Sequence, residues 1–417
     1  MARVSVDAPR SEPELRESHE VEGTRLEAGS RRRGPVRLRS RRRRLALKVG
    51  LAVVTVVALT AGVSLFRALR APGGDPTGLK LVEWVRDHGG GGVATSLENW
   101  WYTSHPPRVG GRPSHGIPRV NVPTAPGQAV PQTPNTTASP RANAPADVRP
   151  LATPALTGEG VWQPTGKLVG GTPGVYQTFL RPDPIHTSVL AGLVWMDTSR
   201  LRAVLYNGLQ VPGGGPWAAG AHVVPADYPG LVAAFNGAFR LDGSRGGYFT
   251  EGRTVQGLVA GRASLVITRD GRVTVAQWGR DATMSPNVVS VRQNLDLIVD
   301  GGQPVPGLVA NDHSRWGATV GGAVYVWRSG LGVDRNGNLI YAAGPGLSIT
   351  SLANLLADAG SVRGMELDIN SEWVSSYTYS GTTAADIEGH KLLGSIQRPN
   401  DRYLHDGTRD FIAMFGR

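Results

Sequence analysis

The sequence contains no cysteine, and this excludes disulfide bonds, thiol catalysis and cysteine-based zinc sites. It also lacks a G-x-x-x-x-G-K-[ST] motif, so its glycine-rich stretches do not match the phosphate loop of nucleotide-binding proteins. No fixed-period repeat is visible, which argues against a solenoid. No pattern calls for a cofactor. The missing cysteines do not assign a compartment.

One long apolar run, residues 49–66, has 18 residues without a charge and lies between Lys48 and Arg67. With residues 45–47 added through a snorkelling Lys48, it reaches the ~20 residues that cross a bilayer. A cleavable signal peptide is the alternative. Its apolar region would be shorter, and no small-x-small site follows directly. We therefore expect an uncleaved anchor over 49–69 that contacts membrane lipid.

Basic residues are concentrated before this run. Residues 1–48 hold 14 Lys plus Arg against 7 Asp plus Glu, whereas the whole chain has a net charge of +11. An arginine excess on this side predicts a cytoplasmic N-terminus and an exported, extracellular C-terminal part at the cell membrane. Residues 71–417 carry only +2 of the net charge. The positive charge of the chain therefore reflects the orientation of the apolar run in the membrane, and no nucleic-acid partner is expected.

Composition divides the chain into segments. We expect, in order, a basic disordered cytoplasmic tail (1–48), a transmembrane anchor (49–69), a juxtamembrane segment (70–104), a Pro/Ala/Thr-rich stalk (105–165) and a globular domain (166–417). The juxtamembrane segment contains an amphipathic stretch, 79–88, and the aromatic pair Trp100-Trp101.

Short apolar runs separated by turn signals dominate the globular part. They lie at 175–180, 188–195, 201–206, 231–235, 263–268, 272–278, 295–299, 323–327 and 339–343. Asp270-Gly271 and Asn336-Gly337 predict hairpin turns. Helix signals are fewer, the best being 351–359 with Thr350-Ser351 as its cap. The predicted fold class is α+β, with a large mixed or antiparallel sheet, few helices and one preceding transmembrane helix.

The stretch 364–373 alternates polar and apolar residues. As a strand it would place Glu366, Asp368, Asn370 and Glu372 on one face, where burial is costly without a purpose. A half-exposed strand with a solvated acidic face is the plain alternative. Oxygen ligation of a divalent cation is another, but we predict no metal site.

Two further stretches contain polar residues that could bind a ligand. Asn236-Gly237 ends an apolar run and opens a glycine-rich loop, which an ordinary hairpin would also explain. In the stretch 311–322, Arg315 has the fork geometry that suits phosphate, and His313 titrates near neutral pH. A surface salt bridge and a solvent-facing loop are the alternatives for these two. Arg409-Asp410 precede an apolar run that we expect to be the closing strand of the sheet.

Together these stretches resemble the phosphodiester glycosidase family, in its N-acetylglucosamine-1-phosphodiester alpha-N-acetylglucosaminidase ("uncovering enzyme") form, as a divergent bacterial member. The similarity rests on Asn236 and Phe239, then Arg315, then a helix and glycine leading into Leu367-Asp368. Ile369, Asn370 and Ser371 stand where the family has glycines, and Trp316 replaces its usual threonine.

The resemblance implies hydrolysis of the bond between a sugar and a phosphodiester, here in cell-envelope glycans. Asp368 would be the base or nucleophile, Glu366 or Glu372 the second carboxylate, and Arg315 the phosphate ligand. Asn236, Asn370 and Ser371 would orient sugar hydroxyls, and His313 would lie nearby. The replaced glycines leave a second reading open, a non-catalytic module that binds an envelope glycan.

Overall fold

Short strands joined by glycine-containing turns build most of the chain after residue 163. The computed structural model describes residues 36–70, 74–90, 104–120, 143–308, 313–316 and 324–417. The chain divides into two units, residues 1–63 and residues 64–417. The strands all lie in the second unit.

The strands form three sheets. The eight-stranded sheet runs β1 (Gln163–Val169), β2 (Thr172–Leu180), β3 (Ala191–Met196), β14 (Leu339–Leu347), β13 (Val326–Asp334), β15 (Ser361–Glu366), β11 (Leu297–Asp300) and β12 (Gln303–Pro304). One five-stranded sheet runs β17 (Glu388–Lys391), β16 (Ser376–Ser380), β5 (Leu231–Asn236), β18 (Phe411–Gly416) and β4 (Leu201–Tyr206). The other runs β7 (Arg253–Gln256), β6 (Tyr248–Thr250), β10 (Val288–Gln293), β8 (Ala263–Thr268) and β9 (Val273–Gln277).

Helices are few and short, apart from the first. They are α1 (Val36–Leu69), α2 (Thr77–Val85), α4 (Leu241–Ser244), α5 (His313–Trp316) and α6 (Ile349–Asp358), with single turns at Arg86–Gly90, Pro225–Asp227 and Arg402–Leu404. The strand ladders are antiparallel, as for β13 with β14 and β18 with β5. The predicted α+β class with a large antiparallel sheet is confirmed. The two Asx-Gly hairpins are also present, as β8–β9 and β13–β14.

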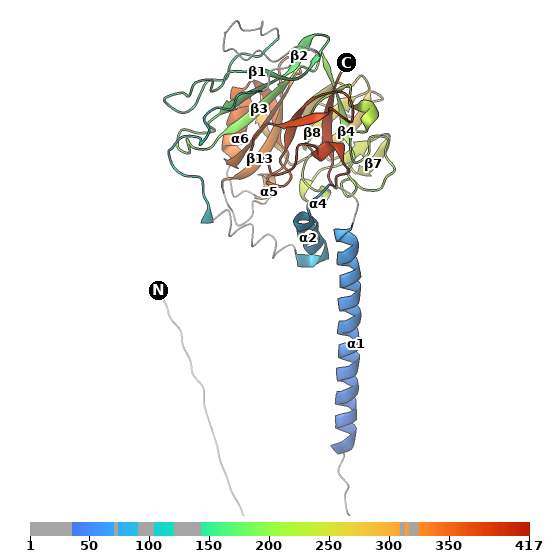
Figure 1. Cartoon of the computed structure of the whole chain (residues 1–417). Helices are drawn as coiled ribbons and strands as arrows, with labels where there is room; N and C mark the ends of the chain where they lie inside the picture. The colour runs from blue at the N-terminus through green and yellow to red at the C-terminus, as the bar shows by residue number, and fades with distance from the viewer. Residues whose placement is uncertain (1–35, 71–73, 91–103, 121–142, 309–312, 317–323) are drawn as a thin grey trace, which may run out of the picture. The chain divides into compact units, whose positions relative to one another are not determined.

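Alternation along the strands creates two cores on the two faces of the large sheet. Val194 and Tyr341 point to the core shared with the five-stranded sheets, whereas their neighbours Trp195 and Ile340 point to the opposite face. That second face is covered by α6, which contacts β13, β14 and β15 and is drawn beside β13 in Figure 1. Three leucines of α6 at helical spacing fill this core, namely Leu352, Leu355 and Leu356.

Helix α6 begins earlier than the sequence predicts. Ser348 is its N-cap, because the Ser348 hydroxyl accepts a hydrogen bond from the backbone N–H of Ser351 at 3.0 Å. The Ser351 hydroxyl in turn accepts from the backbone N–H of Ser348 at 2.9 Å, closing a capping box. The cap expected at Thr350-Ser351 is therefore wrong, since Ser351 already lies within the first turn.

The strand expected over 364–373 is shorter than predicted. β15 ends at Glu366, and the chain turns because one carboxylate oxygen of Asp368 accepts hydrogen bonds from the N–H groups of Ile369 and Asn370, at 2.7 and 3.0 Å. Glu366, Asp368, Asn370 and Glu372 consequently do not share one strand face.

Part of the segment assigned to the stalk packs on the domain. Trp162 is 1% exposed in the core beneath α6, and Glu159 makes a buried ion pair with Arg181 at 2.8 Å. The apolar residues before Trp162 that join this core explain why the chain is ordered there. Most of the tail, residues 121–142 of the stalk, and Trp100-Trp101 lie outside the described residues.

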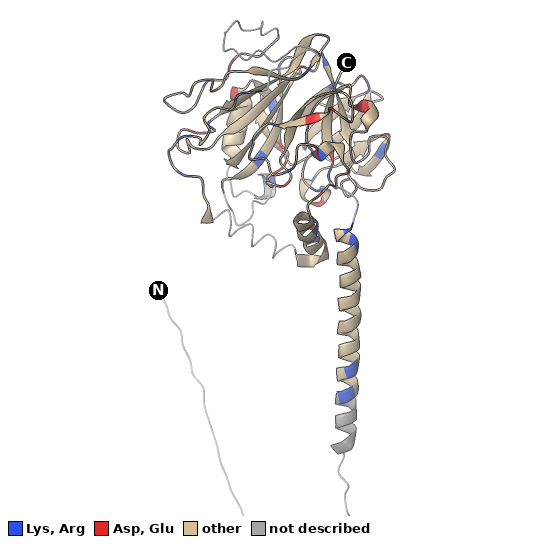
Figure 2. Ribbon diagram, in the orientation of Figure 1, with Lys and Arg blue, Asp and Glu red and all other residues tan. Residues whose placement is uncertain are grey.

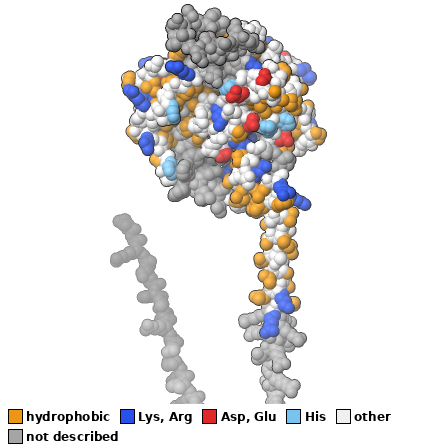
Figure 3. Space-filling view, in the orientation of Figure 1, with side chains coloured by type: hydrophobic (Ala, Val, Ile, Leu, Met, Phe, Trp, Pro, Cys, Tyr) orange, Lys and Arg blue, Asp and Glu red, His pale blue; other side chains and the backbone are white. Residues whose placement is uncertain are grey.

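Helix α1 is the apolar helix that the sequence predicts. Its stretch Arg44–Leu69 is long and apolar enough to cross a membrane, and no residue of its 18-residue apolar window is buried. Hydrophobic side chains cover its length (Figure 3), and Lys and Arg mark both ends of this stretch (Figure 2). Length and composition fit an anchor or a signal sequence.

Candidate functional site

The candidate site lies where the ends of three strands meet. β15 leads into Asp368, β13 brings Ser329 alongside, and β5 ends in Asn236. The backbone N–H of Ser329 donates to the carbonyl of Asp368 at 2.8 Å, and the N–H of Asp368 donates to the Ser329 hydroxyl at 3.2 Å. Asn236 Nδ2 donates to the same hydroxyl at 3.0 Å. The large sheet and a five-stranded sheet are thus joined beside Asp368.

Asn236 uses all of its hydrogen-bonding capacity inside the protein. Its Nδ2 donates to Ser329 and to the carbonyl of Gly237, and its Oδ1 accepts from the Tyr341 hydroxyl at 2.7 Å and from the N–H of Ser375 at 3.1 Å. An amide side chain has two donors and two acceptor sites, so none is left over. In this structure Asn236 positions the site, and its direct contact with sugar remains a prediction.

Glu366 is paired within the core of the protein. Its Oε1 lies 2.5 Å from a guanidinium nitrogen of Arg328, and both side chains are 1% exposed. Burial is the largest influence on this carboxyl and raises its pKa to about 7, against the opposing effect of Arg328. Among the described residues, its second oxygen, Oε2, has no hydrogen-bond partner. Glu366 is therefore held by a fixed buried cation.

Asp368 is buried but lies beside arginines. Burial raises its pKa to about 6, while the charges of Arg409 and Arg402 and the N–H groups of Ile369 and Asn370 favour ionisation. A carboxyl with this pKa is largely ionised at neutral pH and can still accept a proton. This combination suits a general base.

A second buried ion pair supports the same corner. Arg292 contacts Asp410 at 2.8 Å, and both side chains are at most 1% exposed. Asp410 lies so close to Gly237 that a Cβ there would come within 2.4 Å of the carboxylate. Because Gly237 has no side chain, the end of β5 can pack closely against Asp410, the residue before β18.

The loop after Asp368 holds three more predicted residues. Asn370 accepts a hydrogen bond from the N–H of Glu372 at 2.8 Å, and Glu372 raises the pKa of Arg398 through its charge, although burial lowers that pKa overall. Ser371 is half-buried in the same turn. These residues lie near Asp368 along the chain, and their contacts with a substrate remain predictions.

Arg315 has its described contacts elsewhere. It lies 3.4 Å from Asp296 and stacks over Trp316, with its guanidinium 4.5 Å from the ring centroid. Its side chain is 44% exposed, and Asp368 is not among its described partners. His313 lies in α5, but its side chain is outside the described part. The roles of Arg315 and His313 therefore remain predictions.

Sequence reasoning missed the cations of this site. Arg328 acts on Glu366, and Arg402 and Arg409 act on Asp368, yet Arg328 in β13 lies far along the chain from the segment before β18 that holds the other two. The one available signal was the pair Arg409-Asp410 directly before an apolar strand, because two charges at a strand entrance need partners if buried.

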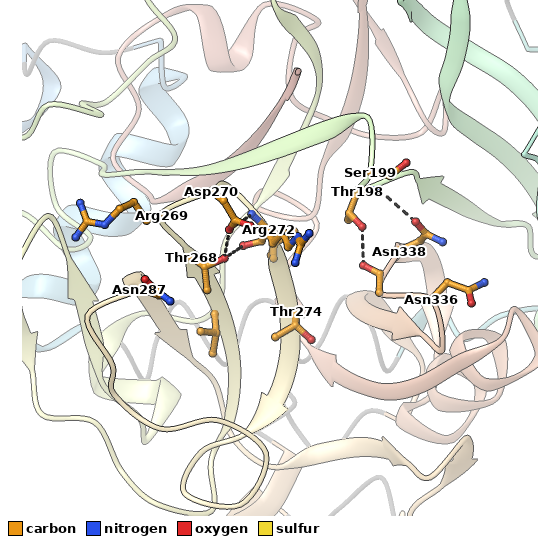
Figure 4. A pocket seen from close by; sticks show the side chains of 13 residues that line it. Thr198, Ser199, Thr268, Arg269, Asp270, Arg272, Thr274, Asn287, Asn336 and Asn338 are labelled. Carbon is orange, nitrogen blue, oxygen red and sulfur yellow. Dashed lines mark hydrogen bonds and ion pairs between the residues drawn. The ribbon is translucent and has the colours of Figure 1, made fainter.

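A separate polar cavity of about 900 Å³ lies between hairpin tips, away from these residues. Figure 4 shows it lined by Thr268, Asp270 and Arg272 of the β8–β9 hairpin and by Asn336 and Asn338 of the β13–β14 hairpin. Asp270 is already bonded to the Thr268 hydroxyl at 2.6 Å, which is the main cause of its lowered pKa. None of the predicted site residues lines the cavity.

Within the described ranges of the chain, no three His, Asp or Glu side chains form a group that could hold a metal ion.

Comparison with known proteins gives one family. A phosphodiester glycosidase model matches residues 229–368, from the start of β5 to Asp368. No match was found among curated proteins. The catalytic domain of zebrafish N-acetylglucosamine-1-phosphodiester alpha-N-acetylglucosaminidase is similar at 12% identity and a TM-score of 0.37, covering 60% of this chain and 85% of that one. A hypothetical protein from Synechocystis aligns at 14% identity and a TM-score of 0.30, covering 61% and 64%. The matched segment contains Asn236, Ser329, Glu366 and Asp368, so the phosphodiester glycosidase family is the one that residues 229–368 resemble.

Proposed function

We propose that the domain is a hydrolase that cleaves the bond between a sugar and a phosphodiester in a cell-envelope glycan. The observation that carries this proposal is Asp368, a buried carboxylate at the end of the family segment with the charge of Arg409 beside it. A carboxylate next to a cation suits a substrate that joins a reacting carbon to an anionic group.

The proposed step requires one base. Asp368 accepts a proton from water, the water oxygen forms a bond to the anomeric carbon, and the bond from that carbon to the phosphate oxygen breaks. The electron pair leaves with the phosphate, which is stable as an anion and needs little help from an acid. Glu366 is proposed as the second carboxylate, which shapes the charge around Asp368 through its pair with Arg328.

A glycan-binding module without catalysis is the second candidate. The observation that favours it is the internal saturation of Asn236, together with the tie between Glu366 and Arg328. Under this proposal Asn236 and Glu366, at the ends of β5 and β15, hold the loop after Asp368 in place and take no part in a reaction.

We further propose that α1 anchors the protein in the cell membrane with the domain outside. The apolar stretch Arg44–Leu69 and the arginine excess before it support this orientation.

Hydrolysis of a sugar-1-phosphate diester with a chromogenic leaving group tests the function, using the full chain in detergent. We expect turnover in the wild type, loss of turnover in Asp368→Asn, and a smaller effect of Arg315→Ala. Retained turnover in a folded Asp368→Asn protein would remove Asp368 from the mechanism. Glycan binding without turnover in the wild type would favour the binding module.

A further inference from the structure

The polar cavity between the hairpin tips lies at the opposite end of the strands from Asp368. Strand β13 passes Ser329, whose hydroxyl accepts a hydrogen bond from the N–H of Asp368, and ends at Asp334, just before the turn that lines the cavity. At ~3.3 Å per residue, the stretch from Ser329 to Asp334 spans about 16 Å. The cavity is therefore separate from the candidate site.

Hydrogen bonds hold the turns around the cavity to one another. The Thr198 hydroxyl donates to the carbonyl of Gly337 at 2.8 Å, and the N–H of Thr198 donates to Oδ1 of Asn338 at 3.3 Å. A guanidinium nitrogen of Arg417 donates to the carbonyl of Asp270 at 2.6 Å, and Nε of Arg417 donates to the carbonyl of Thr198 at 3.2 Å. Because the walls are fixed before a ligand enters, little conformational entropy is lost on binding.

Amide and hydroxyl side chains are spread along the cavity. In Figure 4, Asn287 lies at one side and Asn336 at the other, with Thr274 between them. Asn287 and Asn336 are exposed, and within the part of the chain that the structure describes their side-chain amides have no hydrogen-bond partner. Each amide offers two donors and two acceptor sites, which match the hydroxyl groups of a sugar. This extended arrangement suits a chain of sugars.

Arginines add positive charge to the same cavity. Arg269 and Arg272 line it, and Asp270 is the one acidic residue among the described residues of its lining. Arg272 is 79% exposed and lies 3.2 Å from Asp270, so this pair is largely solvated. Among the described residues no carboxylate pairs with Arg269, whose guanidinium donates to the carbonyl of Pro286 at 3.2 Å. Two arginines against one aspartate leave a net positive charge on the lining.

The lining disfavours other classes of ligand. Of the described residues that line the cavity, Val266 and Val273 are the only ones with apolar side chains, and none is aromatic. A hydrophobic ligand would bury little apolar surface here, and single-stranded nucleic acid would find no ring on which a base could stack. The lining matches a ligand that combines many hydroxyl groups with acidic groups.

We infer that the cavity is a second, non-catalytic binding site for an acidic oligosaccharide. Asn287 and Asn336 bind its hydroxyl groups, and Arg269 and Arg272 bind its acidic groups. Arginine pairs with carboxylate and with phosphate through the same two parallel donors, so either group satisfies the site. The inference goes beyond the proposed function, because the cavity holds a glycan without any role for Asp368.

Calorimetric titration of the full chain in detergent, at constant ionic strength, tests the inference with two acidic probes. They are tetragalacturonate, which carries carboxylates, and mannopentaose phosphate. We expect binding of at least one, and the probe that binds more tightly identifies the acidic group. The methyl ester of tetragalacturonate and unphosphorylated mannopentaose should bind at least tenfold more weakly, as should tripolyphosphate, which has charge without sugar. No binding of either acidic probe, or equal binding of the uncharged forms or of tripolyphosphate, would overturn the inference.

A double variant locates the binding. Arg272→Gln/Asn336→Ala removes one cation and one amide from exposed positions at the tips of two hairpins, and we expect about tenfold weaker binding of the acidic probe. The control Arg280→Gln/Asn400→Ala removes the same two groups from exposed positions outside the cavity and should bind like the wild type. Equal affinity in the wild type and the first double variant would contradict the assignment of the site.

The absence of cysteine allows a test that keeps those side chains. Thr274 lines the cavity and is half-buried, so the single thiol of Thr274→Cys should react with maleimide. The bound acidic probe should slow this reaction severalfold. The thiol of Asn400→Cys, outside the cavity, should react at the same rate with and without the probe. An unchanged rate for Thr274→Cys at saturating probe would place the ligand elsewhere and overturn the inference.

These results do not depend on turnover. Binding of an acidic sugar that requires Arg272 and Asn336, without hydrolysis of any substrate, would support the cavity site and argue against the hydrolase. Turnover that depends on Asp368, with probe binding unaffected by Arg272→Gln/Asn336→Ala, would overturn the inference and leave the hydrolase standing.

Discussion

Asp368 and Glu366 are two residues apart and have different surroundings. Asp368 accepts two backbone N–H groups and lies beside Arg409, whereas Glu366 is tied to Arg328 in the core. Both carboxyls have raised pKa values because burial disfavours their charged forms, with Asp368 at about 6 and Glu366 at about 7. Because its pKa is the lower of the two, Asp368 is the more readily ionised carboxyl at neutral pH.

The pH dependence of turnover follows from this pKa. Asp368 must be ionised to accept a proton, and burial raises its pKa to about 6. We therefore expect kcat/KM to fall as the pH drops through about 6, with one proton taken up. The pH–rate profile of the wild type measures this. A profile that stays flat down to about pH 4, the ordinary range of a carboxyl, would show that another group acts as base.

At the scale of elements, the pair Arg328–Glu366 joins β13 to β15. Changing Arg328→Met should lower the free energy of unfolding by about 3–5 kcal/mol, because Glu366 would be left buried and unpaired. Urea denaturation at neutral pH measures the change. The control Arg315→Met removes a 44% exposed arginine from its ion pair and should cost about 1 kcal/mol or less. Equal losses in the two variants would contradict the buried pair.

The same pair has a defined pH dependence. The pKa of Glu366 is about 7 in the folded protein and 4.5 as its ordinary value, so the folded state holds the proton more tightly. The stability that Glu366 contributes through its raised pKa is fully present below about pH 4.5 and is lost as the pH rises through about 7. The cost of Arg328→Met should therefore be larger at about pH 8 than at about pH 5. A larger cost at the lower pH would show that the pKa is not raised.

Helix α6 offers a second test at this scale. Ser348→Ala removes a side-chain cap and should destabilise the protein by about 1 kcal/mol. Thr350→Ala is the matched control, because Thr350 lies inside the helix and its exposed hydroxyl donates to the carbonyl of Leu308, at 3.2 Å. Thermal or chemical unfolding of both variants measures the difference. A larger loss for Thr350→Ala would place the helix start where the sequence alone suggested.

At the scale of the whole molecule, the prediction concerns α1. If Arg44–Leu69 is an uncleaved anchor, the protein extracted from membranes should have the mass of the full chain. Protease added outside the cell should digest the domain and leave a basic N-terminal fragment. Release of a shorter chain that begins after residue 69 would identify a signal sequence instead.

The sequence by itself determined the apolar span, the antiparallel strands, the two Asx-Gly hairpins and the resemblance to the phosphodiester glycosidase family. These features depend on local composition, period-two alternation and short motifs, which neighbouring residues carry. Asp368 and Asn236 were also predicted from motifs, and their roles stay predictions. The end of β15 at Glu366 was missed because the hydrogen bonds that turn the chain come from a side chain acting on its own backbone. The partners of the site were decided only by the tertiary structure. Arg328 and Arg409 lie far apart in the chain, and the cost of burying an unpaired charge explains why one lies beside Glu366 and the other beside Asp368.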